Sequence, residues 1–184
     1  MNGATHLSLE IVGHAIVSED GMIADREHRM PVALRNDADW LRFQAELDRA
    51  ELVVLGRLGH EAHPNPGRQR LVATSRVAGL TPDPADPRAM LWNPAAMEME
   101  AVLAELGIAD GTIAVTGGTR VFDLFLHRFT RFDLVEVAGI AIPDGVPCFS
   151  AGYPQDVLAA AGLRLVETEA LDPGVTLLVW SREL

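Results

Sequence analysis

The chain has 184 residues, of which 48% are hydrophobic and 22% charged, a balance that predicts one globular domain over residues 1–184. Its 26 acidic residues outnumber 15 basic ones, all of them Arg, so Schiff-base chemistry and a Walker-type phosphate loop, which both need Lys, are excluded. The net charge of -11 argues against a nucleic-acid partner, and the single cysteine, Cys148, excludes an intrachain disulfide and predicts a small buried residue.

No segment has the composition of a targeting or membrane-spanning sequence. Met1–Asp20 lacks a basic region ahead of its apolar stretch, which Glu10 and His14 interrupt. Nowhere does the chain approach the roughly 18 uninterrupted apolar residues of a membrane helix. We therefore expect a cytoplasmic protein without a membrane partner.

The first third of the chain predicts a strand, a long loop and a helix. Leu7–Val17 is apolar and predicts the strand, and residues 18–35 form the polar loop. The helix is expected over Asn36–Arg49, with Asn36 as its cap and Asp39 as the partner in a partial capping box. Three large apolar residues of this helix share one face, which we expect to pack against the core: Trp40, Phe43 and Leu47.

From residue 52 onward, short apolar segments alternate with amphipathic ones. The predicted strands are Leu52–Leu55, Arg70–Ser75, Ala89–Trp92 and Thr112–Thr116, and the predicted helices are Pro94–Leu106 and Thr119–Phe129. The Pro- and Asp-rich segment Gly79–Arg88 predicts a surface loop. Three β-rich segments close the chain: Asp133–Ile142, Arg164–Glu169 and Val175–Arg182. This order predicts an α/β fold with a mainly parallel central sheet flanked by helices and an antiparallel C-terminal edge.

The clearest local signal is Thr116–Arg120, whose sequence Thr-Gly-Gly-Thr-Arg lies between an apolar strand and an amphipathic helix. Unpaired N–H groups at a helix start suit a phosphate, and glycine lets a ligand approach the backbone closely. A tight strand-to-helix turn without a ligand explains the same residues equally well. The segment is not G-x-G-x-x-G, so the Rossmann fingerprint is absent.

Three further patterns lie at characteristic separations from this one. Gly56-Arg57 directly follows a predicted strand, and Pro66-Gly67-Arg68 precedes another. The run Ala-Ile-Val-Ser-Glu-Asp-Gly-Met-Ile-Ala at 15–24 is followed by Met30-Pro31 and by Asp37. In this order the patterns resemble the dihydrofolate reductase family over nearly the whole chain. The resemblance implies the fold of that family and hydride transfer from NADPH to a dihydropterin, with dihydrofolate as the default substrate.

The resemblance also implies a substrate site. Asp37 would be the active-site carboxylate, seven residues after the Met of Met-Pro and three before a Trp, with Asp39 as a rival candidate. Arg68 would grip the carboxylate of a folate tail, and residues 18–30 would be the mobile loop that closes over the nicotinamide. The implied substrate-binding residues are His14, Ile16, Met30, Leu41 and Arg68.

The implied cofactor site is larger. Arg57 and Ser75, with Arg76 or Arg120, would hold the 2′-phosphate of NADPH. Gly117 and Gly118, joined in the family by a cis peptide bond, would lie beneath the pyrophosphate. The full set of implied cofactor contacts is Ala15, Ile23, Gly56, Arg57, Leu58, Gly59, Thr74, Ser75, Arg76, Thr116, Gly117, Gly118, Thr119, Arg120 and Val121.

The chemistry of Asp37 can be argued without the resemblance. An amino group beside a ring N–H presents two donors in a fork, and a carboxylate answers it with two acceptors. Taken alone, Asp37 is more simply a residue of the first helical turn, where it interacts favourably with the helix dipole.

Departures from the family pattern leave the substrate open. Val32 stands where a Trp usually follows Met-Pro, Val137 where a Thr usually supports the carboxylate, and Phe122 where a Tyr usually follows the glycine pair. These losses make dihydromethanopterin a second candidate substrate. The patterns at Ser18–Ala24 and Gly145–Phe149 look like a related riboflavin-pathway branch, which makes a pyrimidine reductase an alternative. A non-catalytic pterin- or nucleotide-binding module is a further alternative.

The remaining expectations concern metals, partners and charge. His60-Glu61-Ala62-His63 lacks the four-residue spacing of helical zinc ligands, so we expect no metal site. The expected partner is a small-molecule pterin, bound by a monomer or a homodimer. Arg57, Arg68, Arg76 and Arg120 are expected around one cleft, which predicts a positive pocket on a negative surface.

Overall fold

The computed structural model of the chain describes residues 9–63 and 67–182. Leu7 and Ser8 of the first predicted strand, and Pro66 of the Pro-Gly-Arg pattern, lie outside the described residues.

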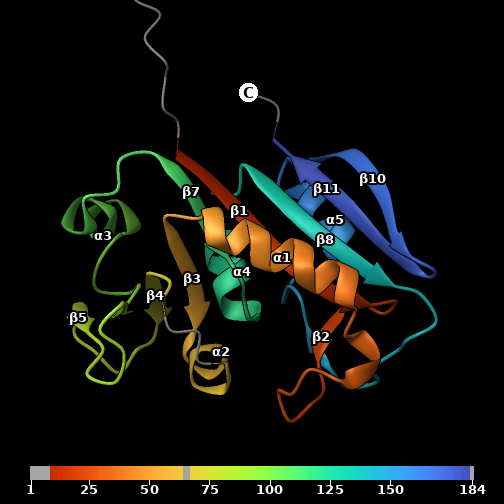
Figure 1. The fold of residues 1–184 in the computed structure, drawn as a ribbon, viewed down its shortest axis with the longest axis horizontal. Helices are drawn as coiled ribbons and strands as arrows, with labels where there is room; N and C mark the ends of the chain where they lie inside the picture. The colour runs from red at the N-terminus through yellow and green to blue at the C-terminus, as the bar shows by residue number, and fades with distance from the viewer. Residues whose placement is uncertain (1–8, 64–66, 183–184) are drawn as a thin grey trace, which may run out of the picture.

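A nine-stranded sheet runs through the middle of the molecule (Figure 1). Its strands are β1 (Leu9–Ser18), β3 (Leu52–Gly56), β4 (Arg70–Ala73), β5 (Leu80–Pro82), β6 (Ala89–Trp92), β7 (Gly111–Val115), β8 (Arg131–Val137), β10 (Arg164–Asp172) and β11 (Val175–Ser181). Their order is β10-β11-β8-β1-β7-β3-β4-β6-β5. The six strands from β8 to β6 are mutually parallel, whereas β10, β11 and β5 run antiparallel to their neighbours. A separate antiparallel pair consists of β2 (Met22–Ala24) and β9 (Val146–Pro147).

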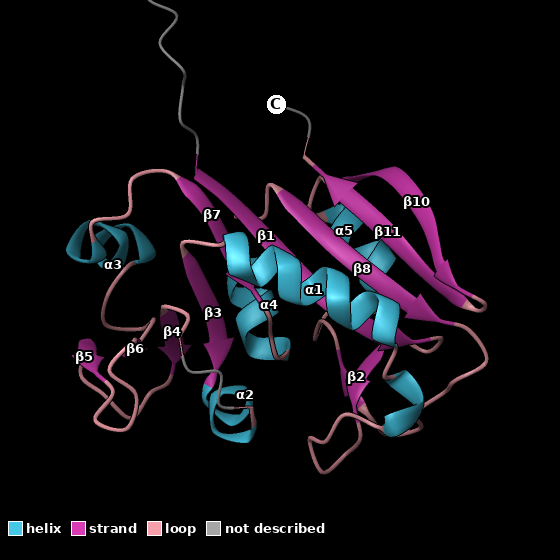
Figure 2. Ribbon diagram, in the orientation of Figure 1, coloured by secondary structure: helices cyan, strands magenta, loops and turns pink. Residues whose placement is uncertain are grey.

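Helices cover both faces of this sheet (Figure 2). They are α1 (Asp37–Arg49), α2 (Arg57–Ala62), α3 (Met99–Leu106), α4 (Thr119–Phe125) and α5 (Pro154–Ala160), with a short 3₁₀ turn, η1 (Val32–Leu34). Consecutive residues of a strand point to opposite faces of the sheet, so Val53 and Val54 of β3 pack into different core layers. Val53 packs with Leu47 of α1, while Val54 belongs to the cluster that contains the apolar residues of α3, α4 and α5.

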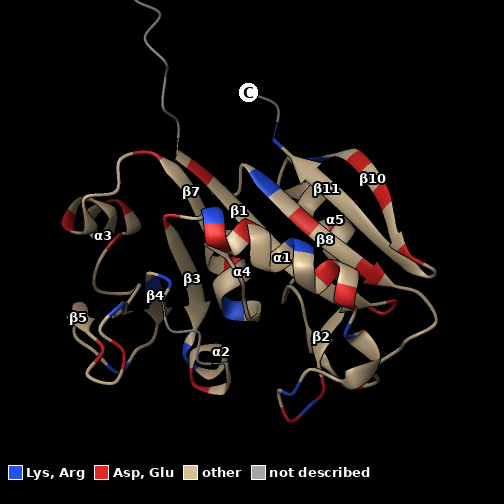
Figure 3. Ribbon diagram, in the orientation of Figure 1, with Lys and Arg blue, Asp and Glu red and all other residues tan. Residues whose placement is uncertain are grey.

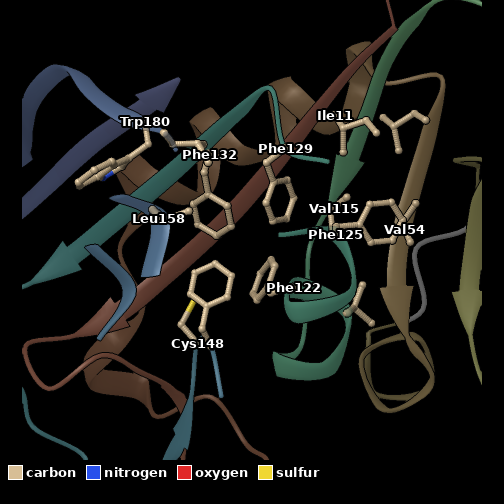
Figure 4. Packing of buried hydrophobic residues seen from close by; sticks show 14 of the residues in the cluster. Ile11, Val54, Val115, Phe122, Phe125, Phe129, Phe132, Cys148, Leu158 and Trp180 are labelled. Atoms are coloured by element: carbon tan, nitrogen blue, oxygen red, sulfur yellow. The ribbon is translucent and has the colours of Figure 1, made fainter. Parts of the chain in front are cut away.

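The larger core layer is rich in phenylalanine (Figure 4). The rings of Phe122 and Phe132 lie 5.4 Å apart between centroids, and those of Phe129 and Phe132 lie 5.1 Å apart, both in edge-on arrangements. Cys148 is buried in this layer, which confirms the sequence prediction, and burial raises the pKa of its thiol well above the usual range.

The predicted fold class is confirmed, including the antiparallel C-terminal edge, but some boundaries differ. The tail is not made of strands alone, because α5 lies between β9 and β10. The first helical turn of the predicted segment Pro94–Leu106 is absent, since Asn93 accepts hydrogen bonds from the backbone of residues 95–97 and α3 begins only at Met99. The segment Gly79–Arg88 contains the short strand β5. Among the described residues, no helix is both long and apolar enough to cross a membrane.

Candidate functional site

Three of the predicted cofactor segments emerge at one edge of the sheet. Strands β7, β3 and β4 are adjacent and parallel, so their carboxyl ends meet at the same edge (Figure 1). Thr116 follows β7, Gly56 ends β3, and Thr74 follows β4. The structure therefore brings segments 116–121, 56–59 and 74–76 together, although they are far apart in sequence.

The glycine pair lies at the centre of this edge. The backbone N–H of Gly56 donates to the carbonyl oxygen of Gly117 at 2.8 Å, which joins two of the loops directly. Gly117 and Gly118 are connected by a cis peptide bond, as the resemblance implies. A Cβ at Gly117, where φ is +96°, would lie 2.7 Å from the ring of Phe122, so only glycine fits there. Ile23 of β2 lies beside the glycine pair, since its Cδ1 would be 3.7 Å from a Cβ at Gly118.

Arg57 is paired with a carboxylate at this edge. One terminal nitrogen of Arg57 donates to both oxygens of Glu61, at 2.8 and 2.7 Å. The hydrogen bond from Arg57 holds the pKa of Glu61 below its usual range, and the charges of Arg57 and Arg76 act in the same direction. Ser75, Arg76 and Arg120 are exposed.

The substrate candidates lie along one flank of α1. Asp37, Leu41, Gln44 and Asp48 recur at helical spacing and therefore form a single stripe. Arg68 contacts this stripe, because its Nε donates to Asp48 at 3.0 Å and a terminal nitrogen donates to the Gln44 carbonyl at 3.3 Å. Its other terminal nitrogen is buried with no hydrogen-bond partner among the described residues. Asp37 and Leu41 are exposed on the flank that Arg68 contacts.

Asp39, the rival carboxylate, points elsewhere. It is two residues from Asp37, which places it about 200° around the helix axis. Its carboxylate accepts a hydrogen bond from Arg42 at 3.2 Å, instead of completing the expected capping box, in which only the Asn36 side chain takes part. Burial raises the pKa of Asp39 above its usual range, against the opposing effect of Arg42.

Arg42 connects Asp39 to a buried ion network that the sequence analysis missed. Asp133 of β8 is fully buried and accepts hydrogen bonds from Arg131 at 2.7 Å and from Arg42 at 2.8 Å. Burial by itself would raise the pKa of Asp133, but Arg131 and its neighbours outweigh that effect and lower it. One part of this network could have been predicted from the sequence, because Arg131 lies two residues before Asp133 and therefore on the same face of the strand.

His14 belongs to this network rather than to the exposed flank. It is 4% exposed, with Nδ1 3.6 Å from Asp133 and its ring edge-on to Phe43. Burial lowers the pKa of His14 to about 4, so its imidazole is neutral near pH 7. Its role in substrate binding stays a prediction. Ile16, the other β1 candidate, is half-buried on the same face and packs with the cluster around Leu34.

Large apolar side chains are exposed on α1 and in segments close to it in sequence. Five of the eight most exposed ones among the described residues fall within residues 30–58: Met30, Val32, Trp40, Leu41 and Leu58. The expectation that Trp40 packs in the core is therefore wrong, since 58% of it is exposed while Phe43 and Leu47 face the sheet.

The Ser-x-Asp-Gly pattern at 18–21 builds an ordered turn. Ser18 accepts a hydrogen bond from the backbone N–H of Met22 at 3.0 Å, and Asp20 accepts one from the N–H of Ile142 at 3.0 Å. The carbonyl of Gly21 accepts from Cys148 at 3.0 Å, next to the β2–β9 pair. Together these bonds tie the segment predicted as the mobile loop to residues 142–148.

Two hollows of the surface lie away from the predicted site residues. One of about 350 Å³ lies between α1 and the C-terminal strands, lined by Arg42, Glu46, Arg131, Val166, Glu167, Glu169, Leu177, Val179 and Ser181. The other, of about 270 Å³, is lined by Gln69, Pro87, Arg88, Met90 and Leu106. Neither includes a residue predicted to bind substrate or cofactor.

The histidine pattern on α2 has structural partners. One ring nitrogen of His60 lies 2.9 Å from Asp83, and the other lies 3.1 Å from Arg70. Across residues 9–63 and 67–182, no group of three His, Cys, Asp or Glu side chains could hold a metal ion.

The predicted positive pocket is partly neutralised. Acidic and basic segments alternate along α1 and α2 (Figure 3). Of the four Arg residues expected around one cleft, Arg57 pairs with Glu61 and Arg68 pairs with Asp48. Arg76 and Arg120 are exposed.

No protein-family model and no curated protein sequence matches the chain. Solved structures do match it. A Shewanella sp. PV-4 protein described as a riboflavin biosynthesis protein aligns over 95% of this chain and 99% of its own, with a TM-score of 0.68 and 18% identity. Dihydrofolate reductase from Enterococcus faecalis, complexed with NADP(H) and RAB-propyl, aligns over 94% and 96%, with a TM-score of 0.63 and 17% identity.

A third match is a diaminohydroxyphosphoribosylaminopyrimidine deaminase/5-amino-6-(5-phosphoribosylamino)uracil reductase from Thermotoga maritima. It aligns over 95% of this chain but only 57% of its own, with a TM-score of 0.66 and 18% identity. At these identities the likeness is one of fold. The sheet order, the glycine pair after β7 and these three structures agree, and the chain has the dihydrofolate reductase-like fold.

Proposed function

We propose that the chain is a reductase that transfers a hydride from NADPH to a dihydropterin, with dihydrofolate as the first candidate. The observation that carries the proposal is the convergence of three loops at one edge of the sheet. Three cofactor loops converge at the carboxyl ends of β7, β3 and β4, while Asp37 and the Arg68-contacting stripe share the exposed flank of α1. A reductase needs both a nucleotide edge and a polar anchor for the acceptor.

The residues at this edge fit a dinucleotide. Gly117 and Gly118 present backbone without side chains, and Gly56 is bonded to Gly117. Arg57, Arg76 and Arg120 supply guanidinium groups for phosphate, for which a planar fork is suited. When bound, the cofactor would supply the hydride. The chain's own task is to hold it and to exclude water, which the tied segment 18–24 and the exposed apolar residues of 30–58 would do.

Asp37 would orient the acceptor. Its carboxylate offers two acceptors to the amino and ring N–H donors of a pterin, and it would favour protonation of the ring beside the carbon that receives the hydride. Asp39 is unsuited to this role because it is engaged with Arg42 on another flank of α1.

A riboflavin-pathway pyrimidine is the second candidate substrate. The Ser-x-Asp-Gly pattern that resembles that branch forms the ordered turn at Ser18–Met22. Of the similar structures, the Shewanella protein is described as a riboflavin biosynthesis protein, and the Thermotoga maritima protein as a deaminase and reductase of phosphoribosylamino-pyrimidine compounds. The anchoring carboxylate and the cofactor edge would serve either substrate.

The test is a panel of dihydrofolate, dihydromethanopterin, dihydrobiopterin and the riboflavin-pathway pyrimidine, each with NADPH, followed by loss of NADPH absorbance. We expect turnover of one of them and a fall in kcat of about 100-fold in Asp37→Asn, the usual scale for general acid–base assistance. Asp156→Asn is the matched control, because Asp156 is an exposed first-turn Asp of α5.

Two outcomes would contradict the proposal. NADPH binding without turnover of any compound would indicate a binding module. Full activity in Asp37→Asn would remove this carboxylate from the reaction.

A further inference from the structure

The proposed cofactor edge contains a carboxylate where a phosphate would need to bind. Glu61 lies one helical turn after Arg57 on α2, and both of its oxygens accept from the same terminal nitrogen of Arg57, at 2.8 and 2.7 Å. The pair is accessible, with 31% of the Arg57 side chain and 53% of the Glu61 side chain exposed. Of the Arg residues expected to hold the 2′-phosphate, Arg57 is therefore already engaged.

Glu61 also interacts with the second loop of this edge. The positive charge of Arg76, which follows β4, contributes to the lowered pKa of Glu61 after the contributions of Arg57. The two Arg residues that lower the pKa of Glu61 belong to segments that follow adjacent parallel strands. The neighbouring His60 side chain is held by Asp83 and Arg70, and it contributes to the lowered pKa of Glu61 after the two Arg residues.

A carboxylate paired with a guanidinium group has opposite effects on the two nicotinamide cofactors. A 2′-phosphate carries about two negative charges, so it must displace Glu61 from Arg57 and accept repulsion from it. A ribose 2′-hydroxyl can instead donate a hydrogen bond to a carboxylate, the arrangement by which acidic residues favour NAD over NADP. The same two Arg residues would favour the phosphate, and Glu61 offsets them.

We propose that Glu61 sets the cofactor preference of this site and that it allows NADH to be used alongside NADPH. This inference rests on the proposed function, since it concerns the same nucleotide edge. The ion pair with Glu61 occupies Arg57, and this competition reduces the affinity for NADPH. Removing the charge of Glu61 frees Arg57 to bind the phosphate, and it also removes the repulsion between Glu61 and the phosphate.

The experiment compares Glu61→Gln with the unaltered protein by titration with NADPH, NADH, 2′,5′-ADP and 5′-AMP. The last two probes report on the 2′-phosphate without requiring turnover. We expect Glu61→Gln to bind NADPH and 2′,5′-ADP about three- to tenfold more tightly, as suits a partly exposed charge pair, with NADH and 5′-AMP unchanged or slightly weaker. Glu100→Gln is the matched control, because Glu100 is an exposed Glu paired with Arg128 elsewhere.

The outcomes separate the inference from the function it rests on. If Glu61→Gln changes NADPH and NADH affinity by the same factor, or weakens NADPH, Glu61 does not set the preference and the inference is wrong while the reductase proposal stands. If the unaltered protein binds none of the four nucleotides, the proposed function fails, and the inference fails with it.

Discussion

Asp133 is a buried carboxylate that three positively charged or polar groups surround. Arg131 and Arg42 hydrogen-bond to it, and the Nδ1 atom of His14 lies 3.6 Å away. The pKa of Asp133 is lower in the folded chain than in the unfolded chain. Its ionised carboxylate therefore stabilises the fold at pH values above the unfolded-state pKa, and this stabilisation is lost as the pH falls through the folded-state pKa. His14 acts in a higher window, because burial lowers its pKa from 6.5 to about 4.

This difference predicts how stability depends on pH. Between pH 6.5 and 4 the unfolded chain binds a proton at His14 and the folded chain does not, so stability falls as the pH drops through this window. The loss from pH 7 to pH 5 should be about 2 kcal/mol. We expect His14→Gln to lose less over the same range, measured by urea denaturation. His127→Gln, at an exposed position, is the control. An equal pH slope in His14→Gln and the unaltered protein would contradict the argument.

At the scale of elements, α1 separates two environments. One flank carries Arg42 and Asp39 into the ion network over β8, and the other carries Asp37 and Leu41 on the exposed side that Arg68 contacts. A single amphipathic helix therefore both anchors the sheet and forms one wall of the proposed site. The two roles lie on different flanks because consecutive residues are about 100° apart around the axis.

The opposite face of the sheet depends on close approach between β1 and the phenylalanine layer. A Cβ at Gly13 would lie 2.2 Å from the Phe132 ring and 3.0 Å from that of Phe129, both fully buried. Gly13→Ala should therefore destabilise the protein by about 1–3 kcal/mol through overpacking, measured as a shift in chemical denaturation. Gly79→Ala is the control, because nothing lies within 4 Å of a Cβ there. A cost for Gly13→Ala no larger than that of the control would show that β1 adjusts freely.

At the scale of the whole molecule, the two ends of the sheet are protected in different ways. β5 is three residues long and ends on Pro82, which cannot donate to a further strand. β10 is nine residues long, but it carries Glu167 and Glu169 and has register irregularities near both ends. Charges and bulges on an edge strand oppose pairing with another chain.

Ligand binding should also be visible in the stability of the whole molecule. A ligand that binds only the folded state at 100 times its Kd adds about 2.7 kcal/mol, which for a chain of this size raises Tm by about 5–10 °C. We expect this shift with NADPH in thermal denaturation, and a smaller one with 5′-AMP. An unchanged Tm at saturating NADPH would count against a nucleotide edge at β3, β4 and β7.

The sequence by itself determined the fold class and the position of the glycine pair. Apolar periodicity is a local property, so β6 was predicted with the observed bounds and β3 to within one residue. The seven-residue α5 was missed because so short a segment shows little periodicity. The Arg57–Glu61 pair was within reach of the sequence, since the two residues are four apart, the spacing at which side chains meet on a helix.

Only the tertiary structure decided which charges meet. Arg68 and Asp48 are 20 residues apart and Arg42 and Asp133 are 91 apart, so no local pattern could pair them. Arg42 joins Asp39 to Asp133, so Asp39 is engaged in the ion network while Asp37 stays exposed. The Arg68–Asp48 pair neutralises part of the expected positive pocket. The physical reason is that ion pairing depends on distance in space and on burial, and both are set by how the strands and helices pack rather than by their own sequences.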